Sequence, residues 1–164
     1  MSSQPSKTHD RWSQLSRSEL IALGKTIVRE KLERLGCTVD PPNGLLDGRL
    51  HVTTPSGRSI EVFVSTQRVG GYVFWTKRRF HPASDRFAAI VLLADAEDPD
   101  VYLVPSSEWL DASPPLKDRD NVGKKSEPEF GISLARSSLP ALARYGWERV
   151  TPLLRDEEYT TPGA

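Results

Sequence analysis

The chain has 164 residues, of which 37% are hydrophobic and 27% are charged. This length and composition predict one globular domain with its own core, because two domains would leave each with too little apolar surface to bury. The 22 Lys and Arg residues balance the 22 Asp and Glu residues. The balance excludes binding to nucleic acid through a high net charge, so any such binding has to depend on local clusters of cations.

The cysteine content and the hydropathy pattern indicate the compartment. The single cysteine, Cys37, excludes an internal disulfide and a cysteine-rich zinc site, and is typical of a protein from a reducing environment. The sequence has no apolar run with the length of a signal peptide near its start or of a membrane span elsewhere. We therefore expect a cytoplasmic protein without a membrane partner.

Polar segments divide the chain into parts. Residues 1–15 are rich in Ser, Gln and Lys, and residues 156–164 are again polar, so both ends are expected to be disordered. Residues 16–155 are expected to form the single domain. Within it, residues 111–129 are charged and proline-rich without a hydrophobic period, which predicts a long surface loop.

The first predicted element is a helix over residues 17–35. Ser16 followed by Glu19 is a capping-box pattern, and Gly36 provides a left-handed end. The apolar residues between them recur at helical spacing: Leu20, Ile27, Val28, Leu32 and Leu35.

The next predicted element is a β-hairpin whose turn contains Pro55-Ser56-Gly57. Apolar and polar residues alternate on both sides of this turn, and a three-residue loop with Gly57 in the left-handed region brings the apolar residues of both strands to one face. The resulting pairs are Val52 with Ile60 and Leu50 with Val62 on the core face, and His51 with Glu61, Arg49 with Phe63 and Asp47 with Ser65 on the other face.

Further strands complete the predicted sheet. Residues 72–76 are aromatic and β-branched and follow a turn at 69–71, residues 87–94 are apolar on both faces as in a central strand, and residues 101–104 form another strand. A capped short helix is expected over 106–110 and a second short helix over 139–145.

Two short segments carry a resemblance to a known family. The segments are GYVFW at 71–75 and YLVPS at 102–106. The predicted elements around them, over roughly residues 20–110, follow the order helix, hairpin, aromatic strand, buried strand, further strand, helix. In this they resemble small bacterial proteins of the PD-(D/E)XK nuclease superfamily. The resemblance implies an α/β fold of the restriction endonuclease-like type, with a mixed central sheet flanked by helices.

The catalytic motif of that superfamily is degenerate here. Active members place an Asp on the first hairpin strand, an acidic or amide residue and a Lys two apart on the second strand, and often a Glu on the first helix. The matching positions hold Arg49, Phe63, Ser65 and Lys25. The predicted register supports this alignment independently, because Arg49 lies opposite Phe63. The resemblance thus implies a nuclease fold without its metal site.

These observations predict a catalytically inactive protein that needs no cofactor and binds DNA, RNA or a protein partner. The alternative is a Mg²⁺- or Mn²⁺-dependent endonuclease with displaced catalytic residues, Asp47, Glu61 and Lys77. On antiparallel strands Asp47 and Glu61 are displaced in opposite directions by about four residues, or roughly 13 Å, which is too far for one cation to bind both. A scaffold subunit of a larger complex is a third hypothesis.

The candidate nucleic-acid-binding residues lie in the altered cleft and on the aromatic strand with its basic run. Arg49 and Ser65 offer donors to an anion without a metal, unless Asp47 and Glu61 neutralise the cleft internally. The basic run at 77–79 predicts either a solvated strand end or a phosphate contact. The full set is Lys25, Arg49, Ser65, Tyr72, Trp75, Lys77, Arg78 and Arg79.

Overall fold

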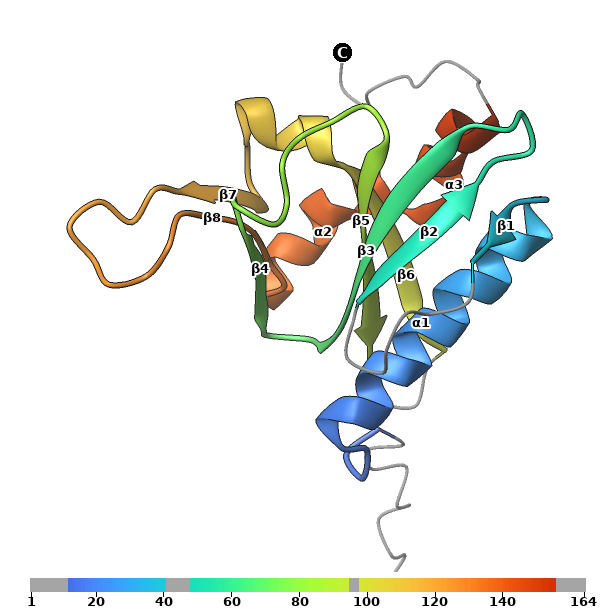
Figure 1. The fold of residues 1–164 in the computed structure, drawn as a ribbon. Helices are drawn as coiled ribbons and strands as arrows, with labels where there is room; N and C mark the ends of the chain where they lie inside the picture. The colour runs from blue at the N-terminus through green and yellow to red at the C-terminus, as the bar shows by residue number, and fades with distance from the viewer. Residues whose placement is uncertain (1–11, 41–47, 95–97, 156–164) are drawn as a thin grey trace, which may run out of the picture.

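The computed structural model describes residues 12–40, 48–94 and 98–155. A mixed five-stranded sheet lies at the centre, with helices around it (Figure 1). The predicted fold class, α/β with a mixed central sheet flanked by helices, is confirmed. In spatial order the strands of this central sheet are β1 (Thr38–Val39), β2 (Arg49–Thr53), β3 (Ser59–Arg68), β5 (Arg86–Leu93) and β6 (Asp100–Pro105).

A second, three-stranded antiparallel sheet stands beside the central one (Figure 1). It contains, in spatial order, β4 (Tyr72–Thr76), β8 (Glu129–Ser133) and β7 (Leu116–Arg119). The prediction that residues 72–76 join the central sheet was therefore wrong, because β4 pairs with β8. The loop predicted over 111–129 is interrupted by β7, and the segment between β7 and β8 projects away from the body (Figure 1).

Helix α1 (Arg17–Arg34) begins at the predicted residue and ends one residue before the predicted end. Ser16 Oγ accepts a hydrogen bond of 3.2 Å from the Glu19 backbone N–H, and Gly36 has a φ of 88°. Both features satisfy backbone groups that a helix end leaves unpaired. Nowhere in the described ranges is a helix long and apolar enough to cross a membrane.

A close contact fixes α1 on the central sheet. A methyl group added at Gly24 would lie 1.8 Å from Thr66 Oγ1 and 3.5 Å from Val64 Cγ1. The helix backbone therefore lies directly over the face of β3 that carries Val64 and Thr66. The buried positions Val28 and Leu32 follow Gly24 at helical spacing and extend this contact along the helix.

The predicted hairpin register is confirmed. Val52 pairs with Ile60 and Leu50 with Val62, and all four side chains are buried. Gly57 has a φ of 90°, as the three-residue loop requires. His51 pairs with Glu61 and Arg49 with Phe63 on the other face; the predicted pair of Asp47 and Ser65 includes a residue outside the described ranges.

Strand β5 is the centre of the sheet, as predicted. It runs parallel to β3 and antiparallel to β6, and every residue from Phe87 to Leu93 is buried. The face of β3 away from α1 contributes Phe63 to a cluster of aromatic rings between the two sheets, with ring-centroid distances of 5.1 to 6.3 Å. We call this the aromatic cluster, and it contains Phe63, Trp75, Phe80, Trp109 and Phe130.

Short helical segments complete the domain. These elements are η1 (Ser106–Asp111), η2 (Arg136–Ser138), α2 (Leu139–Leu142), η3 (Ala143–Tyr145), α3 (Trp147–Val150) and η4 (Thr151–Arg155). The helix predicted over 106–110 is the 3-10 helix η1, and the one predicted over 139–145 is observed as the α-helix α2 followed directly by the 3-10 helix η3.

The contact between α1 and β3 makes Gly24→Ala a test of the fold. We expect the substitution to lower the free energy of unfolding by about 1–3 kcal/mol, because the clash with Thr66 outweighs a gain in helix propensity of roughly 1 kcal/mol. Urea denaturation measures the effect. Thr26→Ala, at an exposed position of the same helix, is the control and should stay within about 0.5 kcal/mol. Equal stability of the two variants would contradict the close contact.

Candidate nucleic-acid interface

Arg49 on β2 and Phe63 on β3 pair with each other, at the position where the family resemblance implies metal-binding carboxylates. Phe63 is only 3% exposed and meets Phe80 edge-on at 5.1 Å. The guanidinium carbons of Arg49 and Arg86 lie 5.9 and 5.8 Å from the centroid of the Phe63 ring. Guanidinium groups at this distance are attracted to an aromatic face. The position is therefore an aromatic ring contacted by two permanent cations.

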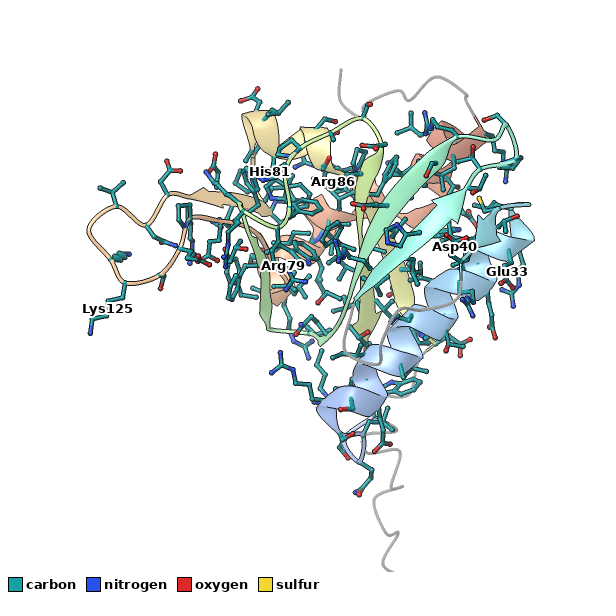
Figure 2. The ribbon with its side chains drawn as sticks, in the orientation of Figure 1. Glu33, Asp40, Arg79, His81, Arg86 and Lys125 are labelled. Atoms are coloured by element: carbon teal, nitrogen blue, oxygen red, sulfur yellow. The ribbon has the colours of Figure 1, made fainter. Side chains whose placement is uncertain are left out.

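Glu61, two residues before Phe63 on the same face of β3, lies close to an arginine and a histidine. Its carboxylate lies 3.2 Å from Arg86 Nη2 and 3.8 Å from His51 Nδ1. Arg86 also donates a hydrogen bond of 2.8 Å to the carbonyl of His81, and Figure 2 shows Arg86 and His81 near each other. This ion pair leaves Glu61 little capacity to coordinate a metal.

A cavity of about 430 Å³ opens beside this position, between the first turns of α1 and the second half of β3. We call it the cleft. Ser65 and Gln67 lie in it on one face of β3, and Gln67 Nε2 donates a hydrogen bond of 3.1 Å to Ser65 Oγ. Two of its lining residues are arginines, and none of the described ones is acidic. The lining consists of Arg17, Leu20, Ile21, Gly48, Val64, Ser65, Thr66, Gln67 and Arg79.

The three residues of the basic run at 77–79 lie in different surroundings: one lines the cleft, and the other two bind carboxylates on or next to the second sheet. Lys77 Nζ donates hydrogen bonds to Asp118 and, at 2.7 Å, to Asp120, and lies 4.6 Å from the centroid of the Phe130 ring. Although burial opposes its charge, these hydrogen bonds and the carboxylate charges raise the pKa of Lys77. Arg78 pairs with Glu127 at 3.3 Å. Only Arg79 of this run lines the cleft.

Two other candidates, Lys25 and Trp75, are buried and partly buried, respectively. Lys25 is 8% exposed and belongs to the face of α1 that carries Val28 and Leu32. Trp75 stacks on Phe80 at 5.2 Å within the aromatic cluster. Neither side chain therefore offers a surface of the kind expected for a phosphate or a base. Tyr72 points to the opposite side of β4 from Trp75, because neighbours alternate along a strand.

Tyr72 lies on the outer face of the second sheet. Its hydroxyl donates a hydrogen bond of 3.2 Å to Glu129 Oε2. Burial and the Glu129 carboxylate raise the pKa of Tyr72 to about 12, against a smaller opposing effect of Arg119. The hydroxyl is thus a proton donor at neutral pH.

Sequence reasoning missed Arg17 and Gln67. Gln67 is two residues after Ser65, so the strand period alone places both on one face. Arg17 is the first residue of the predicted helix, but its position in the cleft depends on how α1 docks on β3, for which the sequence carries no direct signal.

The side chains of Arg49, Phe63 and Ser65 do not fit a divalent metal. Mg²⁺ and Mn²⁺ bind carboxylate and carbonyl oxygens, whereas Arg49, Phe63 and Ser65 supply no anionic oxygen. Over residues 12–40, 48–94 and 98–155, no group of three or more His, Cys, Asp or Glu residues is placed to hold a metal ion. In the alternative set Glu61 and Lys77 bind other partners on different sheets, and Asp47 lies outside the described ranges.

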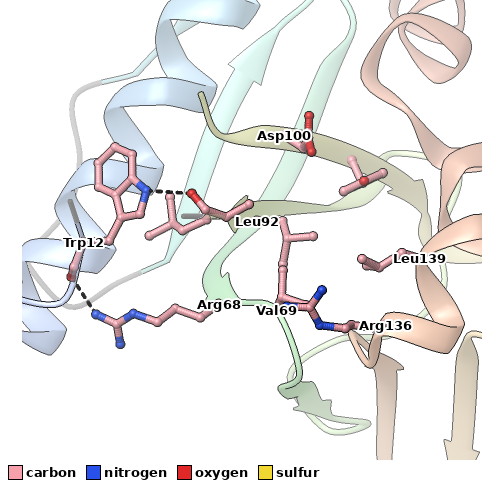
Figure 3. Close-up of a pocket in the computed structure, with 10 residues that line it drawn as sticks. Trp12, Arg68, Val69, Leu92, Asp100, Arg136 and Leu139 are labelled. Carbon is pink, nitrogen blue, oxygen red and sulfur yellow. Dashed lines mark hydrogen bonds between the residues drawn. The ribbon is translucent and has the colours of Figure 1, made fainter. Parts of the chain in front are cut away.

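A larger cavity, about 560 Å³, lies at the carboxyl ends of β3 and β5 (Figure 3). Two hydrogen bonds join residues of its lining: Trp12 Nε1 donates to the Ala94 carbonyl at 3.3 Å, and Arg68 Nη2 donates to the Trp12 carbonyl at 2.6 Å. Trp12 is 7% exposed. Residues 12–15 therefore begin the folded domain, which corrects their assignment to a disordered segment. Arg136 lines the same cavity.

Of the comparisons with known proteins, the one with solved structures finds a similar chain. No family model matches the chain, and no curated protein is significantly similar to it. One solved structure is similar at 13% identity, with 85% of this chain and 98% of the other covered and a TM-score of 0.44. It is Hjc from Archaeoglobus fulgidus, a Holliday junction resolvase from an archaeal hyperthermophile.

The core position of Phe63 can be tested by truncation. We expect Phe63→Ala to lower the free energy of unfolding by about 3–5 kcal/mol, because it leaves a cavity beside Phe80 and removes the ring that contacts two guanidinium groups. Chemical denaturation followed by tryptophan fluorescence measures the loss. Phe74→Ala, at an exposed position of β4, is the matched control and should cost less than about 1 kcal/mol. A similar small loss for Phe63→Ala would show that Phe63 is not part of the core.

Proposed function

We propose that the protein is a non-cleaving member of the nuclease fold that binds nucleic acid through the phosphate backbone. The observation that carries this proposal is the cleft itself: two arginines line it, and none of its described lining residues is acidic. It lies beside the Arg49–Phe63 pair, which the family resemblance aligns with metal-binding residues.

The chemistry of the cleft suits phosphate oxygens. Arg17 and Arg79 carry permanent charges and planar donor groups that match phosphate geometry. The Ser65 hydroxyl and the Gln67 amide add neutral donors between them. Contacts of this kind position a backbone without reading its sequence, so duplex DNA and RNA are both candidate ligands.

The alternative enzyme is a Mg²⁺- or Mn²⁺-dependent nuclease that uses Asp47, Glu61 and Lys77. The ion pairs of Glu61 with Arg86 and of Lys77 with Asp118 favour the non-cleaving function, because both groups would have to leave stable partners before they could act. A role that depends on a protein partner, such as a scaffold subunit, is the second candidate.

A salt titration tests the cleft. If Arg17 and Arg79 each contact one phosphate, Arg17→Ala/Arg79→Ala should weaken binding to a labelled DNA duplex and reduce the slope of log affinity against log salt by about 1.8, since each contact contributes about 0.9. Fluorescence anisotropy at several salt concentrations measures both quantities. Arg34→Ala/Arg149→Ala removes the same charge from exposed positions of α1 and α3 and should leave the slope unchanged.

Two further results would decide between the alternatives. Absence of duplex and RNA binding by the native protein at low salt would exclude the nucleic-acid function and favour a protein partner. We expect no cleavage of plasmid DNA, linear DNA, single-stranded DNA or RNA in Mg²⁺ or Mn²⁺. Cleavage that disappears in Asp47→Ala or Glu61→Ala would establish the nuclease instead.

A further inference from the structure

The outer face of the second sheet carries three planar groups in contact. The rings of Tyr72 and Phe74 have centroids 6.2 Å apart and an interplanar angle of 23°. The guanidinium carbon of Arg119, on β7, lies 4.6 Å from the centroid of the Tyr72 ring. Phe74 is 54% exposed, whereas the inward neighbours Val73 and Trp75 belong to the interior. We call Tyr72, Phe74 and Arg119 the platform.

Glycine on the neighbouring strand lets Tyr72 lie against the sheet. A methyl group added at Gly131 would lie 2.1 Å from the Tyr72 hydroxyl oxygen and 2.4 Å from its ring carbon Cζ. Gly131 pairs with Phe74 on β4, so the Tyr72 ring extends over the backbone of β8 beside Phe74. The hydrogen bond to Glu129 fixes the far end of the ring. The platform is therefore held in place before any ligand arrives.

The charge around the platform is positive. Residues 72–79 and 115–133 include seven Lys and Arg and four Asp and Glu, a net charge of +3, in a chain whose total is zero. The four carboxylates already have partners, because Asp118 and Asp120 bind Lys77, Glu127 binds Arg78 and Glu129 binds Tyr72. Five cations of this region make no ion pair with any described residue: Arg79, Lys117, Arg119, Lys124 and Lys125.

From these features we infer that the platform binds the unpaired bases of single-stranded nucleic acid. A base stacks on an aromatic ring or a guanidinium plane regardless of its identity, and the surrounding cations attract the backbone. The apolar part of the face is limited to Tyr72 and Phe74, which is small beside the roughly 800 Å² that each partner buries in a typical protein interface. The inference rests on the proposed nucleic-acid function but uses a surface separate from the cleft.

The test compares three probes: a 15-residue oligothymidylate, an abasic backbone of the same length, and a duplex. Phe74→Ala should weaken binding of the oligothymidylate by about 5- to 150-fold, the loss expected for one stacked base. It should leave binding of the abasic backbone unchanged, because that probe has no base to stack. Anisotropy titrations at fixed salt give all three affinities.

Two variants control for the loss of a ring. Phe74→Trp keeps a planar group and should bind the oligothymidylate at least as tightly as the native protein, with quenching of the added tryptophan fluorescence. Leu110→Ala removes another exposed apolar side chain, 76% exposed on η1, and should have no effect. Native binding of the oligothymidylate by folded Phe74→Ala would overturn the inference.

The outcomes separate the platform from the cleft. Duplex binding that depends on Arg17 and Arg79, without any effect of Phe74→Ala on the oligothymidylate, would refute the platform alone. Oligothymidylate binding that depends on Phe74 but not on Arg17 and Arg79 would support the platform and refute the cleft. Phe74→Ala that turns a dimer into a monomer in analytical ultracentrifugation, with unchanged oligothymidylate binding, would assign the face to self-association and overturn the inference.

Discussion

Strand β3 is constrained on both edges and both faces, and the rest of the fold follows from this constraint. It pairs antiparallel with β2 and parallel with β5, so its register against both neighbours is fixed. Its residues at even positions face α1 at the Gly24 contact, and Phe63 on the other face enters the aromatic cluster. A shift of one residue in the register of β3 would exchange its two faces. The side chains of Ser65 and Gln67 therefore stay on the face away from α1 as long as the core is packed.

The pair of Arg49 and Phe63 is stable without a bound cation. Two carboxylates on adjacent strands repel each other unless a cation holds them, whereas Arg49 and Phe63 attract each other and Phe63 also contributes apolar packing. Arg86 extends this arrangement by binding Glu61 and contacting the Phe63 ring. A cation held this way does not dissociate as a metal ion does, so the face of the sheet beside the cleft keeps permanent positive groups.

The sequence predicts those parts of the fold that depend on local pattern. The limits of α1, the hairpin register and the burial of β5 follow from a capping box, a glycine turn and an apolar run. The place of β4 in the second sheet does not follow from local pattern, because its partner β8 lies more than 50 residues later in the chain. The alternation of inward and outward side chains along β4 would be the same in either sheet. For the same reason the sequence indicated neither the burial of Trp75 nor the ion pair of Lys77 with Asp118, which both depend on the second sheet.

The net charge of zero does not indicate which cations of the protein are paired with carboxylates. Lys77, Arg78 and Arg86 bind carboxylates of nearby segments, so these cations neutralise the protein itself. Arg17 and Arg79 in the cleft, and Arg119 at the platform, make no ion pair within the described ranges. A ligand phosphate has to displace a carboxylate from the cations that are already paired. It does not have to do so at the arginines of the cleft and the platform. Ion pairing between distant segments, rather than total charge, thus determines which surfaces of this protein can bind an anionic chain.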